Sequence, residues 1–152
     1  MNISLRVIDA TNYEECIRLG VGVTQLGNIV PNVYSLAELA VRPEARAYGV
    51  YQGDNMIGFV MIIENQETHE YDIHRFMIDF RYQWKWYGTR ALQEIIELIK
   101  GFPDRPHRIS IMFLVENTYA ENLYKKVGFI DSGKTLYNEK HRYTEKIFYY
   151  TL

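Results

Sequence analysis

The stretch NTYAENLYKKVGF, residues 117–129, carries the pattern that decides the fold. Thr118 and Glu121 have the spacing of a capping box, which is typical of a helix start. Gly128 then ends the helix, and Phe129 resumes extended chain. The apolar side of the helix, at helical spacing, consists of Ala120, Leu123, Tyr124 and Val127. The pattern predicts an amphipathic helix over residues 118–127.

The segments before this helix predict a crossover connection. Residues 108–115 form a nearly uninterrupted apolar run, as expected of a strand at the centre of a sheet. Residues 70–79 are predicted as a strand that follows a polar loop, and residues 88–100 place apolar side chains on one helical face that ends at Gly101. Strand, helix and strand therefore follow one another in the manner of a crossover within one sheet.

The remaining segments add hairpins and two short helices. Gly53, Asp54 and Asn55 form a turn between two apolar segments, which predicts an antiparallel hairpin. The predicted strands are 3–8, 47–53, 56–63, about 134–137 and 145–151, and capping boxes at residues 11–14 and 35–38 predict helix starts. We expect an α+β, or mixed α/β, fold: a central twisted mixed sheet of six to seven strands flanked by about four helices. Residues 1–152 are expected to form a single domain.

Composition excludes several functional classes. With 47% hydrophobic residues, 24% charged residues and a formal charge of −2, the chain is typical of globular proteins and unlike a nucleic-acid scaffold. Cys16 is the only cysteine, which allows no internal disulfide and indicates a reducing compartment. The N-terminus lacks a signal peptide, and no apolar run approaches the roughly 20 residues of a membrane span. We therefore expect a cytoplasmic protein that binds neither nucleic acid nor membrane.

The histidines do not predict a metal site. His69, His107 and His141 lie far apart in sequence and show no ligand spacing. No metal is expected.

A polar turn before helix 88–100 is the first candidate binding site. The first N–H groups of a helix have no partner within the helix, and the helix dipole adds partial positive charge at that end. If residues 83–88 curl so that their amides converge, they form a nest of the size of a phosphate. Two indole rings, Trp84 and Trp86, stand in this turn where such nests usually have small residues.

Taken together, these segments resemble the GNAT superfamily of N-acetyltransferases. Residues 117–129 are similar, almost position by position, to the family's Asn-x-x-Ala-x-x-Leu-Tyr-x-x-x-Gly-Phe. In the family pattern Gln/Arg-x-x-Gly-x-Gly/Ala, Gln83 and Gly88 match, but Trp86 stands at the first signature glycine. The front of the chain, around residues 25–37, is similar to bacterial spermine/spermidine acetyltransferases.

The resemblance implies acetyl-CoA as the cofactor. The turn amides would bind its pyrophosphate, the backbone of residues 76–78 would pair with the pantetheine arm where two strands diverge, and Asn117 would contact it from the next strand. The residues expected at the cofactor are Phe76, Met77, Ile78, Gln83, Trp84, Lys85, Trp86, Tyr87, Gly88, Thr89, Asn117 and Tyr124.

Two residues are candidates for proton transfer. Tyr124 matches the family's tyrosine whose hydroxyl lies by the CoA sulfur, and a tyrosine keeps its proton at neutral pH; the same position also suits a core residue. His74 stands where polyamine-acetylating relatives tend to carry an acidic residue, and it could accept the amine proton through water. A strand histidine without a catalytic role is the other interpretation of His74.

The sequence thus predicts an N-acetyltransferase that moves acetyl from acetyl-CoA to a primary amine of a small molecule by direct attack, with di- and polyamines among the candidates. The alternative is a catalytically impaired binding or regulatory module, in which Trp84 and Trp86 alter the pyrophosphate loop. An indole pointing into the nest would displace the cofactor, whereas one pointing outward would leave the amides available. A homodimer is left open, because the ending Phe148-Tyr149-Tyr150 suits either an interface strand or a core edge.

Overall fold

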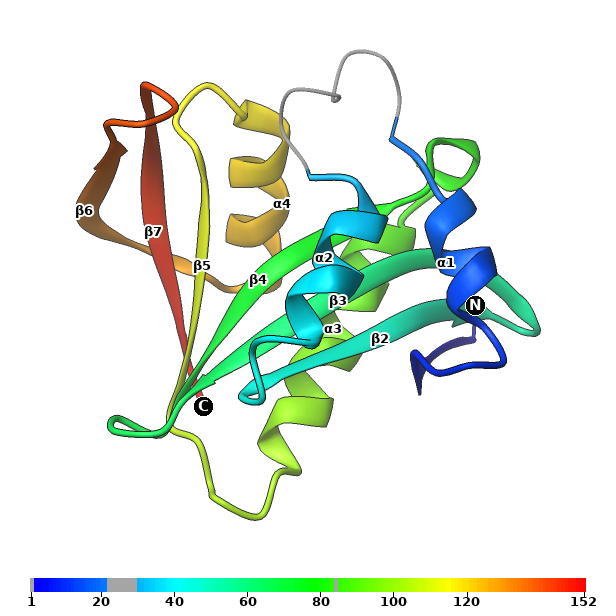
Figure 1. Cartoon of the computed structure of the whole chain (residues 1–152). Helices are drawn as coiled ribbons and strands as arrows, with labels where there is room; N and C mark the ends of the chain where they lie inside the picture. The colour runs from blue at the N-terminus through cyan, green and yellow to red at the C-terminus, as the bar shows by residue number, and fades with distance from the viewer. Residues whose placement is uncertain (1, 22–29, 84) are drawn as a thin grey trace.

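A computed structural model describes residues 2–21, 30–83 and 85–152, and Figure 1 shows how its elements are arranged. Within these residues, seven strands form one mixed sheet in the order β1-β2-β3-β4-β5-β7-β6. Among the described pairs, β4 and β5 alone run parallel, which confirms the predicted crossover through the helix between them. The strands are β1 (Ile3–Val7), β2 (Ala45–Gln52), β3 (Asn55–Asn65), β4 (Glu70–Ile78), β5 (Arg108–Leu114), β6 (Ile130–Asn138) and β7 (Tyr143–Thr151).

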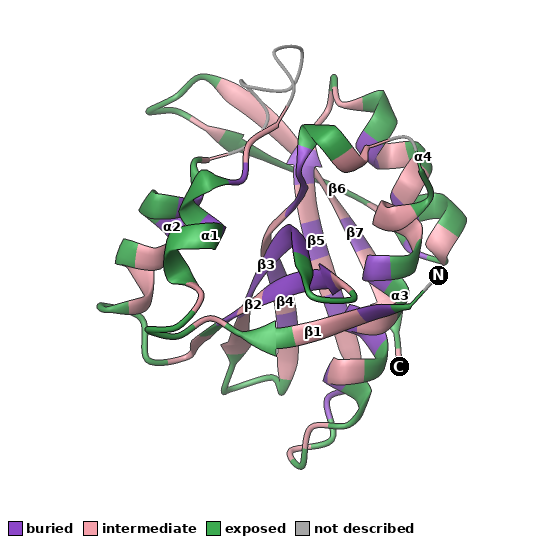
Figure 2. Cartoon of the chain, turned by 90° about the vertical axis from the view of Figure 1, so that its right-hand side faces the viewer, coloured by how far each residue is buried: buried purple, intermediate pink, exposed green. Residues whose placement is uncertain are grey.

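Helices cover both faces of the sheet, as Figures 1 and 2 show. Helices α1 (Tyr13–Arg18) and α2 (Asn32–Leu39) lie on one face, and α3 (Tyr87–Lys100) and α4 (Thr118–Val127) lie on the other. A 3-10 turn, η2 (Phe80–Tyr82), connects β4 to α3. The described part therefore has the predicted class, a mixed sheet of seven strands with four α-helices.

Strand β3 shows why its sequence is almost continuously apolar. Phe59 and Met61 pack with Cys16 and other side chains on the α1 and α2 side, whereas Val60 and Ile62 pack with those of α3. All of these side chains are fully buried. Because successive strand residues point to opposite faces, a strand covered on both sides needs apolar residues at every position. Burial of each such side chain stabilises the fold by about 1.5–3 kcal/mol.

The predicted start of the second helix is wrong by three residues. Helix α2 begins at Asn32, three residues before the predicted box, and Ser35 is buried within it. The preceding Pro31 accepts the first backbone hydrogen bonds, from Tyr34 and Ser35. Proline's fixed φ suits a helix start, and it outweighed the capping-box spacing.

Helix α4 begins as predicted, but its cap is a different residue. The Asn117 side chain, and not that of Thr118, accepts a hydrogen bond from the Ala120 backbone N–H at 3.1 Å. Gly128 ends the helix with φ of 118°, in the left-handed region that the predicted glycine stop requires. Both ends of α4 are thus fixed by residues within the motif itself.

The C-terminal hairpin has the predicted order, but β7 is an inner strand. It pairs with β5 on one side and β6 on the other, and Phe148 is fully buried. The tyrosine-rich ending therefore lies within the sheet, and its part in a dimer interface stays a prediction. The edge strand is β6, which exposes Ile130, Leu136 and Tyr137.

Candidate active site between β4 and β5

Strands β4 and β5 diverge in the middle of the sheet. Their pairing runs from Glu70 opposite Arg108 to Ile73 opposite Ile111, although both strands continue beyond it. At the same place, the register of β4 with β3 shifts, so that His74 is an extra residue on β4. Such a β-bulge bends a strand and increases its twist. The bulge therefore coincides with the opening of the sheet, just before residues 76–78, where the family resemblance implied divergent strands.

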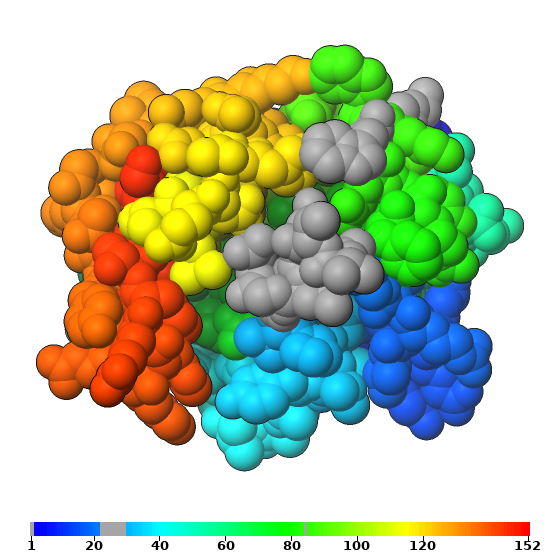
Figure 3. All heavy atoms as spheres, turned by 90° about the horizontal axis from the view of Figure 1, so that it is seen from above, coloured from blue at the N-terminus to red at the C-terminus, as the bar shows by residue number. Residues whose placement is uncertain are grey.

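A cavity of about 420 Å³ fills this opening. Figure 3 looks onto this end of the molecule, with the start of α4 and β7 on one side and α1 and α2 on the other. Beyond the divergence point, Phe76, Met77 and Ile78 line the cavity from β4. Across from them, β5 and α4 contribute Phe113, Leu114, Asn117, Ala120, Leu123 and Tyr124. The predicted cofactor residues of β4 and α4 thus lie around one space, which we call the main cavity.

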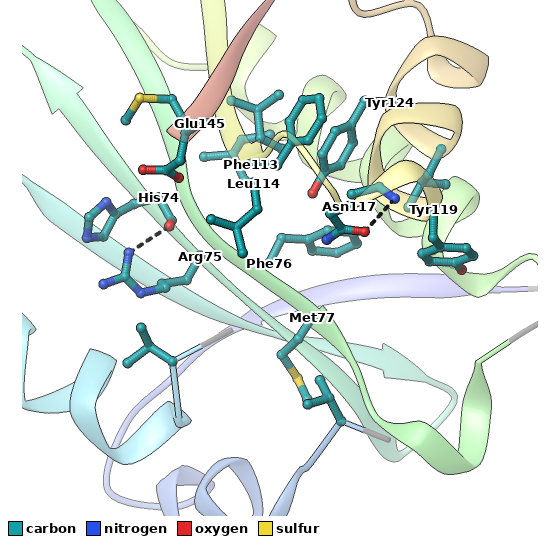
Figure 4. Close-up of a pocket in the computed structure, with 18 of the residues that line it drawn as sticks. His74, Arg75, Phe76, Met77, Phe113, Leu114, Asn117, Tyr119, Tyr124 and Glu145 are labelled. Atoms are coloured by element: carbon teal, nitrogen blue, oxygen red, sulfur yellow. Dashed lines mark hydrogen bonds between the residues drawn. The ribbon is translucent and has the colours of Figure 1, made fainter. Parts of the chain in front are cut away.

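Tyr124 lies on the α4 side of the main cavity. Its ring packs edge-on against Phe113, with centroids 5.2 Å apart, and is 7% exposed. Burial, with a smaller contribution from Tyr119, raises the pKa of Tyr124 well above that of an ordinary tyrosine. In Figure 4 the hydroxyl points toward the cavity beside Asn117. The side chain is therefore both a core ring and a protonated hydroxyl at the cavity wall, so the two sequence interpretations are compatible.

The turn before α3 brings Gln83 and Trp86 into fixed positions. The Gln83 side chain donates a hydrogen bond to the Ile78 carbonyl at 2.9 Å, which ties the turn to the end of β4. Trp86 is the N-cap residue of α3, with φ of 67° and ψ of 2°. This is the left-handed conformation, which costs about 1–2 kcal/mol for a non-glycine residue. Lys85 is exposed, and Trp84 lies outside the described residues.

The first turn of α3 offers backbone donors. Within the described part of the chain, the N–H groups of Tyr87, Gly88 and Thr89 make no hydrogen bond, whereas Arg90 already donates to the Trp86 carbonyl at 3.1 Å. Unpaired amides and the helix dipole favour an anion at this place. The donors thus fit a diphosphate.

A second cavity of about 280 Å³, which we call the side cavity, adjoins the main cavity at the α3 terminus. Gly88 and Thr89 line it from α3, and Asn122 and Lys126 line it from α4. Trp86 also lines it, but its side chain is 68% exposed. The Lys126 ammonium lies 3.4 Å from the centre of the indole ring. The indole is thus part of the rim of the side cavity.

Charged groups gather at the other end of the main cavity. His74 Nε2 lies 3.2 Å from Glu38 Oε2, and its Nδ1 lies 3.7 Å from Asp72 Oδ2. Arg75 donates to Glu38 at 3.0 Å, and Asp72 accepts from the Ser110 hydroxyl at 2.9 Å. Figure 4 shows His74 well apart from Tyr124. The predicted base therefore stands within a charged network at the far end of the cavity.

Glu145 is a site residue that sequence reasoning missed. It belongs to β7, opposite Leu114 of β5, and lines the main cavity near His74 and Arg75 (Figure 4). Burial raises the pKa of Glu145, and the nearby Asp72 raises it further, although Arg75 and His74 act in the opposite direction. Nothing in the surrounding sequence marks this glutamate, because strand pairing alone brings it to the cavity. Glu38, within the misplaced helix start of α2, was missed for a similar reason.

Asp79, to which the sequence assigned no chemistry, anchors the turn. It is fully buried and accepts hydrogen bonds from the Gly20 N–H at 3.0 Å and from the N–H and side chain of Arg81. Burial alone would raise the pKa of Asp79, but the hydrogen bonds from Arg81 and Gly20 outweigh it and hold the pKa below the ordinary value. This carboxylate ties the segment after α1 to the cofactor turn.

His69 lies close to two carboxylates, although the sequence spacing indicated no ligand group. Ligand atoms of three residues lie within 4.8 Å of one another: Glu64 near the end of β3, His69 in the loop between β3 and β4, and Asp104 in the loop between α3 and β5. The Tyr71 hydroxyl donates to Asp104 at 3.1 Å, so a neutral donor already satisfies part of this group. The expectation of no metal stays a prediction.

Comparison with known proteins agrees with this geometry. Residues 29–129 match the model of the acetyltransferase (GNAT) family. A spermine/spermidine N(1)-acetyltransferase of Bacillus subtilis (strain 168) is 25% identical over 144 residues, which cover 91% of this chain and 94% of that protein. A probable spermine N(1)-acetyltransferase of Bacillus subtilis subsp. natto is 24% identical over the same shares.

A solved structure has the same fold. The crystal structure of spermidine N-acetyltransferase from Vibrio cholerae, in complex with CoA and spermine, aligns with a TM-score of 0.79 and 19% identity. The alignment covers 98% of this chain and 95% of that chain.

None of the helices in the described residues is long and apolar enough to span a membrane.

Proposed function

The chain belongs to the acetyltransferase (GNAT) family, and on that premise we propose that it acetylates a primary amine of a polyamine. The family establishes an N-acetyltransferase that uses acetyl-CoA. The observation that supports a polyamine as the acceptor is a main cavity with the Tyr124 hydroxyl at one end and the carboxylates of Asp72 and Glu145 at the other. The curated relatives named above act on spermine or spermidine.

The residues at the cofactor end fit acetyl-CoA. We propose that the amides of Tyr87, Gly88 and Thr89 hold its diphosphate, and that the β4 backbone from Phe76 to Ile78, which β5 leaves unpaired beyond Ile73, holds its pantetheine arm. Asn117 would lie beside it at the start of α4. When bound, acetyl-CoA supplies an acetyl group activated as a thioester.

Tyr124 is the proposed proton donor. Its raised pKa keeps the proton on the hydroxyl at neutral pH, and the hydroxyl faces the main cavity. A donor held in a packed ring loses little orientational freedom when it acts, which favours proton transfer to the departing sulfur.

His74 is the proposed proton acceptor, through a chain of water molecules that would connect it along the main cavity to the reacting amine. The Glu38 carboxylate 3.2 Å from Nε2 favours the tautomer with the proton on that nitrogen, which leaves Nδ1 as the acceptor. Asp72, 3.7 Å from Nδ1, attracts the positive charge that the ring gains. An oriented histidine beside carboxylates is a common arrangement for a general base.

Asp72 and Glu145 are the proposed binding residues for a second ammonium group of the acceptor. Glu145 makes no ion pair within the described residues, and its raised pKa reflects burial and repulsion from Asp72. An ammonium placed between the two carboxylates would relieve that repulsion. A polyamine carries such a second charge several methylenes from the reacting amine, and a monoamine does not.

An amine panel tests the proposal. Thiol release from acetyl-CoA would be followed with spermidine, a diamine, and a monoamine of matched chain length. We expect kcat/KM for spermidine to exceed that for the monoamine roughly 100-fold, because the monoamine lacks the second ammonium and loses about two charge-assisted contacts. Equal kcat/KM values for the two amines would contradict a polyamine acceptor and leave acetyl transfer itself in place.

The impaired module is the second candidate function, and Trp86 is the reason to test it. The impaired module requires the indole ring to cover the Gly88 and Thr89 amides, so that the diphosphate cannot bind them. Calorimetry with CoA decides the question: absence of heat at millimolar CoA, together with tight binding by Trp86→Gly, would support a blocked seat. We expect the wild-type chain to bind CoA.

We also propose a single-domain protein in the cytoplasm, in agreement with one unpaired, buried cysteine, Cys16. A homodimer through the exposed edge of β6 is proposed as its assembly, since Ile130, Leu136 and Tyr137 are exposed there. Size-exclusion chromatography with light scattering measures the assembly.

A further inference from the structure

We infer that Lys126 is the cationic partner of the cofactor's diphosphate, and that Trp86 is a positioning residue that holds Lys126 at the side cavity. The inference rests on the use of acetyl-CoA, on which the proposed function also rests. It explains why a large aromatic residue occupies a left-handed position at the N-terminus of α3.

The side cavity places the two kinds of anion-binding group opposite each other. Gly88 and Thr89 line it with the first turn of α3, where the N–H groups are unpaired within the described residues. Lys126 lines it from α4, seven residues after Tyr119 on the same helix face. An anion bound to the amides therefore lies in the space that the Lys126 ammonium borders.

Lys126 differs from its neighbour Lys125 in how its charge is satisfied. Lys125 forms an ion pair with Glu121 at 2.8 Å, so its charge is neutralised. Lys126 has no carboxylate partner among the described residues, and its ammonium rests on the face of Trp86 at 3.4 Å. A lysine charge without a carboxylate is available to a phosphate.

The indole restricts where that charge can be. A free lysine side chain loses considerable rotamer freedom when it binds a ligand. The contact with the Trp86 ring already restricts this freedom, because a cation is attracted to the face of an indole. Because the ring is attached at the N-cap of α3, the ammonium stays at the mouth of the side cavity. Trp86 thus acts through Lys126, while its own backbone leaves the α3 amides in place.

Calorimetric titration with CoA tests the charge. We expect Lys126→Met, which keeps the aliphatic stem, to raise the Kd for CoA about tenfold, as loss of one charge-assisted phosphate contact requires. Lys125→Met is the matched control, with the same loss of charge on the adjacent residue, and should change the Kd less than twofold. Titration with 3′-dephospho-CoA, which keeps the diphosphate, should show the same tenfold loss for Lys126→Met.

A second set of variants tests the positioning role. Trp86→Phe keeps an aromatic face and should bind CoA nearly as the wild type does, whereas Trp86→Leu should raise the Kd about threefold. Both keep a non-glycine residue at the left-handed position, so backbone strain is matched. In the Lys126→Met background, Trp86→Leu should have no further effect, because the residue acts through the lysine.

The outcomes separate this inference from the proposed function. Equal Kd values for Lys126→Met and Lys125→Met would overturn the inference while CoA binding stands. A loss that disappears with 3′-dephospho-CoA would also overturn it, because Lys126 would then bind the 3′-phosphate. A wild-type chain that binds no CoA would overturn both. Thermal unfolding of each variant confirms that the fold is intact.

Discussion

The two ends of the main cavity are built in different ways. The cofactor end consists largely of main chain: the unpaired half of β4 and the first turn of α3, with Tyr124 beside them. The amine end consists of side-chain charges from α2, β4 and β7, among them Glu38, Asp72 and Glu145. Backbone donors remain when a side chain changes, so the cofactor end can accommodate a tryptophan. The amine end depends on each carboxylate, so single substitutions there should change amine binding, and pH should act mainly there.

The largest expected effect comes from Tyr124→Phe. Removal of the hydroxyl leaves the ring contacts with Phe113 and Phe129 in place but removes the proposed proton donor. We expect kcat to fall roughly 100-fold, with the Kd for CoA within twofold of wild type. Steady-state kinetics and calorimetry measure the two quantities. An unchanged kcat would show that Tyr124 has no role beyond packing. The cofactor end would then act through main-chain groups alone.

Asp79→Asn should weaken the link between the segment after α1 and the turn before α3. Both carboxylate oxygens accept hydrogen bonds, whereas an asparagine amide has one oxygen and one NH2 group. That NH2 group would face either the Gly20 N–H or the Arg81 donors, so at least one hydrogen bond to the buried carboxylate is lost. We expect the free energy of unfolding to fall by about 2 kcal/mol. Denaturant unfolding measures it, with the fully exposed Asp54→Asn as a control within about 0.5 kcal/mol of wild type.

The lowered pKa of Asp79 adds a pH dependence with a defined sign. Because the folded pKa lies below the ordinary 3.8, the stabilisation is complete above that pH and is lost as the pH falls through the lower folded value. The difference in stability between wild type and Asp79→Asn should therefore shrink below pH 3.8. A constant difference at all pH values would show that the carboxylate charge is not its cause.

Glu145→Gln should weaken polyamine binding selectively. The change keeps the shape of the side chain and removes one of two carboxylates near the amine. We expect KM for spermidine to rise about tenfold and KM for acetyl-CoA to stay within twofold. Glu139→Gln, in the exposed turn between β6 and β7, is the matched control. If both KM values rise together, the two ends are not independent.

The smallest effect is the pH dependence of KM for spermidine. The carboxylate of Glu145 has a raised pKa and shares its surroundings with Asp72, His74 and Arg75. As the pH falls, Glu145 takes up a proton before an ordinary glutamate of pKa 4.5 would, and the attraction for an ammonium is lost. KM should rise about threefold on the acid side in wild type and should rise less in Glu145→Gln. Parallel profiles for the two enzymes would contradict this role of Glu145.

How much of the site could be predicted depends on where each residue lies. Tyr124, Asn117 and Gly88 belong to compact motifs and line the cavities, and their roles at the cofactor stay predictions. Glu145 belongs to no recognisable pattern, and Lys126 occupies a position within residues 117–129 that the family pattern leaves open. Glu145 reaches the cavity because β7 inserts between β5 and β6, and Lys126 reaches it because α4 packs next to α3.

The sequence by itself determined the order of the elements, the crossover through α3 and the glycine stop of α4. These features follow from side-chain periodicity and from backbone preferences of residues that are near neighbours in the chain. Only the tertiary structure decided that β4 and β5 separate after Ile73, at a bulge on His74, and that carboxylates from α2, β4 and β7 lie near this bulge. Strand register and the packing of distant segments set those positions, and no local pattern of residues contains that information.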